Sequence, residues 1–323
     1  MKRVGIFVED RKFNDLGFKT FIETKRPDDV VQFVQIVESK PFDSQDPFDL
    51  IIHKSFHLLE KNKDKYAQFQ NYVQSNPSTK FIDQMDAVNL ILNRYEQFRG
   101  IANAIQSAGL IDDVIIPSFC QCTGNFDSDI QALHEAKLKF PAICKPLNSH
   151  GNADVHKMML LFKEADLKLI RSDSVLQSFE NHDGFLLKAY VIGDFLHLVV
   201  RPSITNLSKE HEPILFNSQD VSKENSRSNL NNSQSVPNIN DLDVDKELIK
   251  RAVDALRTHL GLDLINIDFV VLSKADHKQR LAIIDVNIFP NYKCVPDFFF
   301  HLENLVREKL NLPKLTSPEI FKQ

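Results

Sequence analysis

The 323-residue chain has no tryptophan, nine glycines and four cysteines. Nine glycines are too few for a glycine-rich loop to be the main phosphate-binding device, and neither GxxxxGK[ST] nor GxGxxG occurs in the sequence. These absences exclude P-loop nucleotidases and argue against dinucleotide-binding enzymes. The HRD and DFG signatures of protein kinases are missing as well. Any phosphate that this protein binds must therefore be met mainly by side chains.

Long apolar runs and an excess of basic charge are absent too. No stretch of 18 apolar residues and no charged-then-apolar leader occurs, so we expect neither membrane insertion nor secretion. We place the protein in the cytoplasm, with the nucleus as an alternative. The formal net charge of −5 argues against a protein that coats nucleic acid. Cys120, Cys122, Cys144 and Cys294 form no zinc-type CxxC pair, which predicts reduced, structural thiols.

The first hundred residues are typical of a small parallel α/β domain. Three short apolar runs are separated by an amphipathic stretch at 13–24 and by polar segments; they lie at 3–8, 29–37 and 49–53. In such sheets ligands bind beyond the carboxyl ends of the strands. Lys12 follows the first run and Lys54 ends the third, so both are candidates for contact with an anionic ligand or, alternatively, ordinary surface lysines.

The rest of the chain alternates helical and strand-like segments. Helical spacing predicts helices at 83–107, 129–139, 243–260 and 297–310, with Arg94 on the polar side of the first and Gly261 as the stop signal of the third. More than half of residues 217–240 are Asn or Ser, a composition that cannot bury a core and predicts a mobile loop or insertion.

A Gly-Asp pair at 193 and 194 predicts a β-hairpin between GFLLKAYVI and DFLHLVVRP. Folding the hairpin on this turn places Lys188 opposite Val199, Tyr190 opposite His197 and Leu186 opposite Arg201. Lys188 and Arg201 then share one face of the strand pair, where two cations need anions or open solvent.

Three oxygen-bearing side chains interrupt two apolar runs near the carboxyl end. Asp268 lies in LINIDFVVL, and Asp285 and Asn287 lie in LAIIDVNIFPNY. A hairpin through residues 273–280, with Leu272 opposite Leu281, places Asp268 opposite Asp285, and alternation puts Asn287 on the same face. Buried carboxylates need compensation, and oxygen donors of this kind suit Mg²⁺. The alternative is that each Asp caps a turn or pairs with a buried Arg.

The order of several short segments resembles one known family. FPAICKPLNSHG, VLQSFENHDGFLLKAYVIGD, VVRPS, FNSQDVS, NIDFV and IDVNIFPNY occur as in inositol 1,3,4-trisphosphate 5/6-kinases, also called inositol-tetrakisphosphate 1-kinases, which are ATP-grasp proteins. The similarity runs from VGIFVEDRK to the last helix. It implies a mixed α/β (α+β) fold in which an amino-terminal parallel domain precedes two antiparallel-sheet lobes that clamp ATP.

The resemblance also implies roles for individual residues. On the nucleotide side it points to Arg94, Lys145, the hinge segment 177–188 that begins with Gln177, Ser178, Phe179 and Glu180, and further to Lys188, Ser203, Ser218 and Ser222. On the acceptor side it points to Lys12, Lys54, His150, Gly151, His156, Lys188, Arg201, Asn287 and Asn291. Lys188, Asp285 and Asn287 would be catalytic, and Asp268, Asp285 and Asn287 would bind one or two Mg²⁺ ions.

Two departures from the family pattern affect the acceptor side. Asn291 stands in PNY where relatives commonly have PGY, although Asn tolerates the left-handed conformation that a glycine adopts. The spacing between His150 and His156 is one residue longer than in relatives, so the choice between these two histidines stays open. No general base stands out, and neither the hydroxyl that is phosphorylated nor reverse transfer to ADP can be read from the sequence.

We therefore expect a monomeric inositol polyphosphate kinase in three parts, at 1–82, 83–186 and 187–323. Because each phosphate monoester carries about −1.5 to −2 charges, three on one ring bring roughly −4.5 to −6, which Lys12, Lys54, Lys188 and Arg201 would offset locally. Two alternatives remain: an ATP-grasp carboxylate–amine ligase, and a non-catalytic sensor of inositol phosphates or nucleotide. Fewer acceptor-side lysines would favour the ligase, and binding without transfer would favour the sensor.

Overall fold

The computed structural model describes residues 1–45, 47–151, 153–208, 211–222, 228–231, 236–272 and 281–321. The loop predicted at 273–280 and parts of the predicted insertion, at 223–227 and 232–235, lie outside these ranges. Within the described ranges, no helix combines the length and the apolar composition needed to cross a membrane.

The amino-terminal region forms a four-stranded parallel sheet in the order β2-β1-β3-β4, which confirms the predicted α/β pattern. Its elements are β1 (Lys2–Phe7), α1 (Asp10–Asp15), α2 (Phe18–Glu23), β2 (Val31–Gln35), η1 (Asp43–Gln45), β3 (Leu50–His53), η2 (Ser55–His57), α3 (Leu58–Lys61), α4 (Lys63–Ser75) and β4 (Lys80–Ile82). The strand β4 was not anticipated from the sequence. All four residues of β3 are buried, as a strand covered on both faces requires.

The middle of the chain contains three α-helices and four strands of one five-stranded sheet. Its elements are α5 (Met85–Leu92), α6 (Arg94–Ser107), β5 (Val114–Ile115), β6 (Phe119–Cys122), α7 (Phe126–Glu135), β7 (Ala142–Pro146), η3 (Ala153–His156), β8 (Lys157–Leu161), η4 (Glu164–Leu169) and β9 (Ser174–Ser178). The single helix predicted at 83–107 is divided at Asn93, whose side chain accepts the N–H groups of Tyr95 and Glu96 and so caps α6.

The carboxyl-terminal region contributes β10 (Phe185–Ile192), β11 (Phe195–Pro202), β12 (Ile214–Asn217), α8 (Ser218–Val221), α9 (Lys246–Leu260), β13 (Leu264–Val271), β14 (Leu281–Ile288), α10 (Phe298–Lys309) and η5 (Pro318–Phe321). The helix α9 begins at Asp245, whose side chain accepts the Leu248 N–H, and ends at Gly261 with φ 68°, the predicted stop. The prediction of a loop throughout 217–240 is wrong for α8, where Val221 turns inward and is buried.

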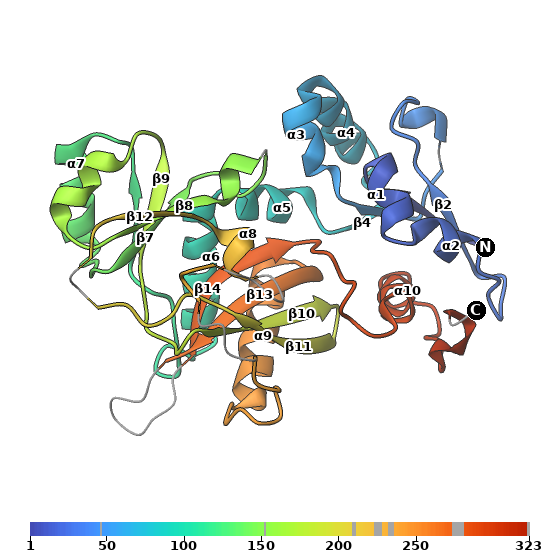
Figure 1. The fold of residues 1–323 in the computed structure, drawn as a ribbon. Coiled ribbons are helices and arrows are strands. Elements are labelled where there is room, and N and C mark those ends of the chain that lie inside the picture. The colour runs from blue at the N-terminus through green and yellow to red at the C-terminus, as the bar shows by residue number, and fades with distance from the viewer. Residues whose placement is uncertain are drawn as a thin grey trace.

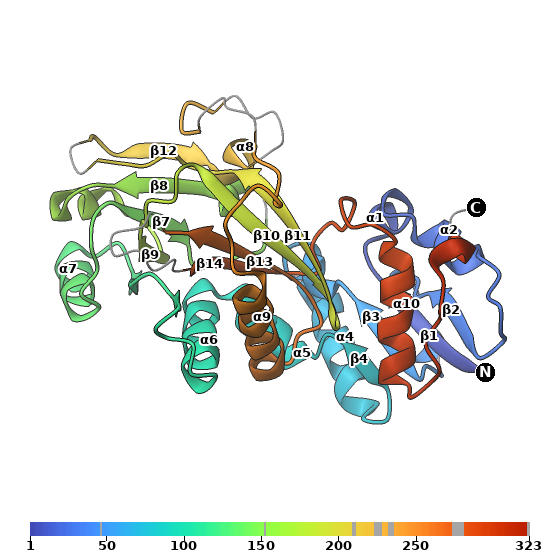
Figure 2. The same ribbon diagram turned by 90° about the horizontal axis from the view of Figure 1, so that it is seen from below.

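Two five-stranded sheets face each other across the centre of the molecule, as Figures 1 and 2 show. One has the order β12-β8-β7-β9-β6, and the other has the order β11-β10-β13-β14-β5. The helices α6 and α9 pack beneath the second sheet and share its main hydrophobic core. The helix α7 covers the first sheet. This pair of sheets leaves a space between them in which a ligand can be held from two sides.

The helix α10 lies beside the amino-terminal sheet although it comes from the end of the chain (Figures 1 and 2). A buried ion network joins the two: Glu303 accepts from Arg26 at 3.1 Å and pairs with Arg307 at 2.9 Å, and Arg307 also binds Asp28 at 2.8 Å. The amino-terminal core thus includes residues separated from it by more than two hundred positions.

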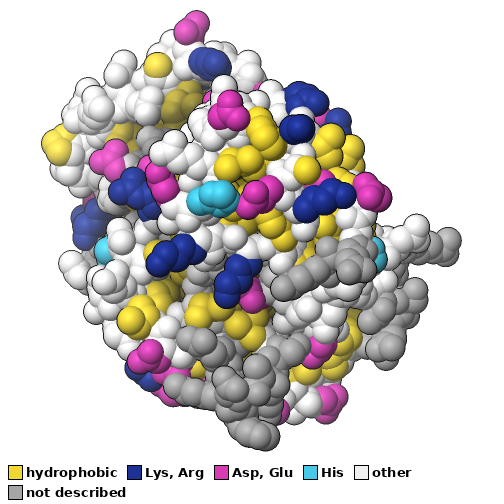
Figure 3. All heavy atoms as spheres, turned by 90° about the vertical axis from the view of Figure 1, so that its left-hand side faces the viewer, with side chains coloured by type: hydrophobic (Ala, Val, Ile, Leu, Met, Phe, Trp, Pro, Cys, Tyr) yellow, Lys and Arg dark blue, Asp and Glu magenta, His cyan; other side chains and the backbone are white. Residues whose placement is uncertain are grey.

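On the face around α7, cations and carboxylates are interspersed (Figure 3).

Candidate active site

A pocket of about 260 Å³ lies between the two central sheets. Its walls come from β7 and β9 on one side, from β10, β13 and β14 on the other, and from α8 at one edge. All the residues assigned to the nucleotide by resemblance line this single pocket: Arg94, Lys145, Gln177, Ser178, Phe179, Glu180, Lys188, Ser203, Ser218 and Ser222. The fold therefore brings together residues that are spread over more than 120 positions of the sequence.

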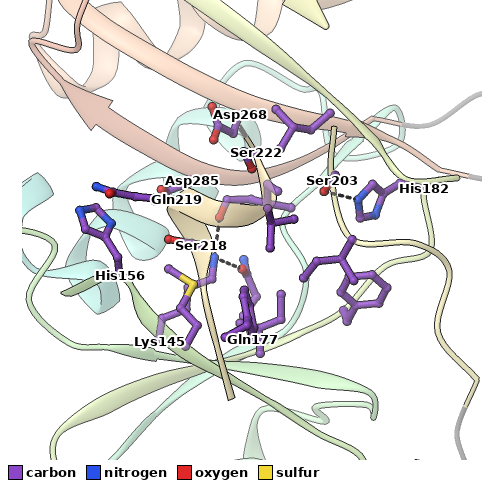
Figure 4. Close-up of a pocket in the computed structure, with 18 of the residues that line it drawn as sticks. Lys145, His156, Gln177, His182, Ser203, Ser218, Gln219, Ser222, Asp268 and Asp285 are labelled. Carbon is purple, nitrogen blue, oxygen red and sulfur yellow. Dashed lines mark hydrogen bonds between the residues drawn. The ribbon is translucent and has the colours of Figure 1, made fainter. Parts of the chain in front are cut away.

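Lys145 is buried and points from β7 into the pocket, beside Gln177 (Figure 4). Its ammonium donates to Gln177 Oε1 and to the backbone oxygen of Ile284, both at 2.8 Å. Ile284 is the extra residue of a β-bulge in β14, which leaves its carbonyl outside the regular ladder. Burial lowers the pKa of Lys145 to about 8, although nearby Asp285 opposes this shift. The cation is thus held in place but only partly compensated, as a phosphate-binding group should be.

Arg94 is buried, and the prediction that it lies on the polar side of its helix is wrong. Its guanidinium donates to the backbone oxygens of Pro146 at 2.6 Å, Asn148 at 2.8 Å and Val155 at 3.4 Å. Burial lowers the pKa of Arg94, and Asp285 counteracts this. Arg94 therefore fixes the segment after β7 while contributing charge to the pocket wall.

Much of the pocket lining is apolar. Its apolar residues are Ile143, Met158, Leu186, Ile204, Phe216 and Val221. His182 Nε2 lies 2.7 Å from Ser203 Oγ (Figure 4). His182 Nδ1 lies 2.6 Å from the Glu180 backbone oxygen. Burial raises the pKa of Glu180. Sequence reasoning missed His182 and the apolar lining; strand alternation at Ile143 and Met158 was the available signal, and a loop histidine offers none.

The hairpin registers agree with the sequence near the site and differ away from it. Lys188 pairs with Val199, Tyr190 with His197 and Leu186 with Arg201, as predicted. Asp268 lies opposite Asp285, also as predicted. The predicted pairing of Leu272 with Leu281 is wrong, because Leu281 pairs with Val271. The bulge at Ile284 shifts the register by one residue and restores the expected alignment at the carboxylates.

Asp268, Asp285 and Asn287 share one face of the second sheet with Lys188. The Lys188 ammonium lies 2.8 and 2.7 Å from the two oxygens of Asp268, and Asn287 Nδ2 lies 3.3 Å from Asp285 Oδ2. Burial raises the pKa of Asp268, Lys188 opposes that shift and Asp285 adds to it. A further cation at this point would relieve the repulsion between the two carboxylates.

The donor set fits a weakly coordinated Mg²⁺. Among the described residues, no three His, Cys, Asp or Glu side chains converge into a complete metal cage. Two carboxylates and an amide oxygen on one face match the preference of Mg²⁺ for one or two carboxylates, with water and phosphate oxygens filling its other positions.

Ser203, Ser218 and Ser222 reach the pocket from two separate segments. Ser203 follows β11, while Ser218 and Ser222 stand at the two ends of α8, which Asn217 caps by accepting the Gln219 N–H. The short helix thus presents both serines and Gln219 to the same space.

Only some of the acceptor-side candidates line the pocket. His156, Lys188 and Asn287 line the pocket, whereas Lys12, Lys54, His150, Gly151, Arg201 and Asn291 do not. Lys54 donates to the Phe289 backbone oxygen at 2.5 Å, and burial lowers its pKa to about 8. Lys12 Nζ lies 3.4 Å from Glu9 Oε2. Both lysines are thus engaged by groups of the protein itself.

The structure also shows the surroundings of the two departures from the family pattern, at Asn291 and between His150 and His156. The positive φ of the 289–293 loop belongs to Phe289, at 39°, rather than to Asn291, whose side chain accepts the Lys293 N–H. His156 lines the pocket, whereas His150 does not, and burial lowers the pKa of His150. Arg201 lies on β11 opposite Leu186, on the face that carries Lys188.

Comparison with known proteins gives matches over nearly the whole chain. Residues 110–308 match the family model of the inositol 1,3,4-trisphosphate 5/6-kinase ATP-grasp domain, and residues 3–88 match its pre-ATP-grasp domain. The inositol-tetrakisphosphate 1-kinase of Danio rerio is 32% identical over 92% of this chain and 76% of its own length. That of Xenopus laevis is 32% identical over 97% of this chain and 80% of its own.

Solved structures share the architecture at much lower identity. A D-alanine–D-alanine ligase from Bacillus anthracis has a TM-score of 0.57 at 12% identity, with 96% of each chain covered. A D-cycloserine synthetase has a TM-score of 0.56 at 13% identity, covering 95% of this chain and 99% of its own. At this identity the likeness is one of fold alone.

Proposed function

The chain belongs to the inositol 1,3,4-trisphosphate 5/6-kinase family and is an inositol phosphate kinase with the ATP-grasp fold; from this premise we propose that it transfers the γ-phosphoryl group of ATP to ring hydroxyls of inositol 1,3,4-trisphosphate and inositol 3,4,5,6-tetrakisphosphate. The observation that carries the proposal is that Lys188, Asp268 and Asp285 lie side by side across three strands in a pocket that the expected nucleotide residues also line.

ATP is the co-substrate, and the pocket offers different chemistry at its two ends. The end beside His182 and Ser203, where Ile204 and Glu180 also line the wall, suits a purine ring. The cationic end, with Lys145 and Arg94, suits phosphates. The base would therefore lie toward His182 and the phosphates toward Asp285.

Asp268, Asp285 and Asn287 would hold one or two Mg²⁺ ions, which would neutralise phosphate oxygens and so favour the transfer. Lys188 lies beside them and would bring a positive charge to the transferred group. Lys145 would hold the nucleotide phosphates from the opposite sheet. Because phosphoryl transfer depends mainly on positioning and charge, we assign the main catalytic roles to these residues, and none of them is assigned as a general base.

The acceptor would lie between the second sheet and the amino-terminal domain. A trisphosphate brings roughly −4.5 to −6 charges, so it would need Lys12, Lys54, Lys188 and Arg201 together, with His156, Asn287 and Asn291 as neutral contacts. His150 and Gly151 stay candidates at the edge of this region. A local cation group of this kind is compatible with a chain of net charge −5.

We further propose that residues 1–82 bind the acceptor, that 83–186 and 187–323 form the two halves of the ATP clamp, and that the last segment also completes the first domain through α10. The protein would act as a cytoplasmic monomer on small molecules, without nucleic acid or membrane partners. The buried free thiols Cys120, Cys122 and Cys144 support a reducing compartment.

A substrate panel tests the proposal directly. ADP release from ATP should be stimulated by the two inositol polyphosphates, abolished by chelation of Mg²⁺, and unchanged by unphosphorylated inositol, which matches the ring without the charges. Stimulation by D-alanine or other amino acids, without any by inositol polyphosphates, would indicate a ligase. Calorimetric binding of inositol polyphosphates without phosphorylated product would instead indicate a sensor.

A further inference from the structure

The Lys188 ammonium is bound to the Asp268 carboxylate, which we expect to bind the metal. The ammonium contacts both oxygens of Asp268, at 2.8 and 2.7 Å, and the two side chains are 18% and 11% exposed. A metal ion on the same oxygens would lie within about 4 Å of the ammonium, where two cations repel each other strongly in a partly buried site. Metal binding at Asp268 therefore requires another position for the Lys188 ammonium.

Asn266 lies next to this ion pair. It precedes Asp268 by two residues on β13, so both side chains project from the same face of the sheet. Its neighbours across the ladder are Tyr190 and Asn287, as those of Asp268 are Lys188 and Asp285. Its Oδ1 lies 3.5 Å from the Lys188 ammonium, at the outer limit of a hydrogen bond.

The hydrogen bonding of Asn266 is incomplete in this arrangement. The residue is 2% exposed, and its buried Nδ2 has no hydrogen-bond partner among the described residues. A buried amide in the middle of an apolar strand that makes one long contact is costly to the fold. Such a group is typical of a functional position, because a purely structural role would be met better by an apolar side chain.

On the premise of the proposed kinase function, we propose that Asn266 is a positioning residue that receives the Lys188 ammonium when Asp268 turns to the metal. The move is short, because Oδ1 is already within 3.5 Å of Nζ. The released ammonium then stays on the same face of the sheet, next to the carboxylates, where it can bind a phosphate.

Asparagine suits this position because its amide side chain carries no charge. A carboxylate would neutralise the ammonium and weaken its action on phosphate. A leucine of similar size would offer no acceptor, so the ammonium would remain on Asp268 and compete with the metal. An amide oxygen holds the lysine while leaving its full charge available.

Direct binding of Mn²⁺ tests this without any turnover. Free Mn²⁺ would be followed by electron paramagnetic resonance while the ion is titrated into the full chain. We expect Asn266→Leu to weaken Mn²⁺ binding by about tenfold, the order of one hydrogen bond from a charged donor. Lys188→Met should bind Mn²⁺ at least as tightly as the unaltered protein, because the competing ammonium is gone.

The double variant gives the decisive comparison. If Asn266 acts through Lys188, then Asn266→Leu has no effect on Mn²⁺ affinity in the Lys188→Met background. An equal loss in both backgrounds would overturn the proposal, as would no loss in either. Asn266→Ser, which retains a hydroxyl acceptor, should stay close to the unaltered protein, and Asn266→Ala should not; this pair replaces the leucine variant if thermal unfolding shows that it does not fold.

The outcome separates this role from the proposed function. Unaltered Mn²⁺ affinity in Asn266→Leu, together with normal phosphorylation of inositol polyphosphates by the unaltered protein, would overturn only the role of Asn266. Absence of that phosphorylation would overturn the proposed function, whatever the Mn²⁺ titrations give.

Discussion

The nucleotide side and the acceptor side of the site are built differently. Every expected nucleotide residue lines one pocket between two sheets of the same clamp. Of the expected acceptor residues, only His156, Lys188 and Asn287 reach that pocket, and the lysines of the amino-terminal domain lie outside it. The first side is assembled on the two facing sheets and α8, and the second also involves the amino-terminal domain.

The cations of the two sides also differ in what they contact. Lys145 is held by a neutral amide and a backbone oxygen, and it remains available to an anion. Lys188 and Lys12 are held by carboxylates, and Lys54 by the Phe289 backbone oxygen. The difference indicates that Lys145 is preorganised for the nucleotide, whereas Lys12, Lys54 and Lys188, the last assigned to both sides, must exchange internal partners for phosphates.

Loss of Asp285 should have the largest effect, because this residue is expected both to bind the metal and to take part in catalysis. We expect Asp285→Ala to lower kcat by about 10³-fold or more through loss of the metal-held charge. Circular dichroism and thermal unfolding should remain near those of the unaltered protein, since the carboxylate is partly exposed. Unchanged phosphorylation of inositol polyphosphates by this variant would refute the metal assignment.

Loss of Glu303 should disturb the acceptor domain through stability alone. Glu303→Ala leaves Arg26 and Arg307 buried beside each other, so we expect the free energy of unfolding to fall by about 3–5 kcal/mol in urea denaturation. The matched control on the same helix is Glu308→Ala, whose exposed pair with Lys314 should contribute about 0–1 kcal/mol. Similar losses in both variants would contradict the importance of the buried network.

Lys145→Met should separate the two sides. We expect the dissociation constant for MgATP to rise by about 10- to 100-fold, the order of one or two charge-assisted hydrogen bonds. The affinity for inositol polyphosphate, measured by calorimetry without nucleotide, should stay the same. Lys163→Met, which alters a lysine exposed outside the pocket, is the control. Equal losses of both affinities would mean that the two sides are not independent.

The smallest effect should appear in the pH profile of the acceptor side. Burial and the nearby Lys12 lower the pKa of Lys54 to about 8, so the Lys54 ammonium is present below pH 8 and lost as the pH rises through that value. With MgATP saturating, kcat/KM for the acceptor should therefore fall above pH 8. Lys54→Arg should remove that fall, because its guanidinium stays charged. A fall that persists in the arginine variant would exclude Lys54 as its source.

Local patterns predicted the two hairpins of the second sheet and the helix α9, but not the short strands β5, β6, β8, β9 and β12. Strand alternation and the Gly-Asp turn placed Lys188 opposite Val199, and the i+4 spacing before Gly261 predicted α9. Family resemblance then selected the pocket residues. The predictions from local patterns succeed because the interactions that determine a turn or a helix end lie within a few positions along the chain. The burial of Arg94 and the bulge at Ile284 could not be predicted in this way, since their partners come from distant strands.

The sequence by itself determined the first three strands, the two hairpins β10–β11 and β13–β14, most helices and the oxygen donors Asp268, Asp285 and Asn287, because alternation and turn signals act locally. Only the tertiary structure decided which partners the cations take: Lys188 binds Asp268, Lys54 binds a backbone oxygen after β14, and α10 returns to the amino-terminal sheet. The physical reason is that charge compensation and burial depend on segments brought together by packing, which no local pattern specifies.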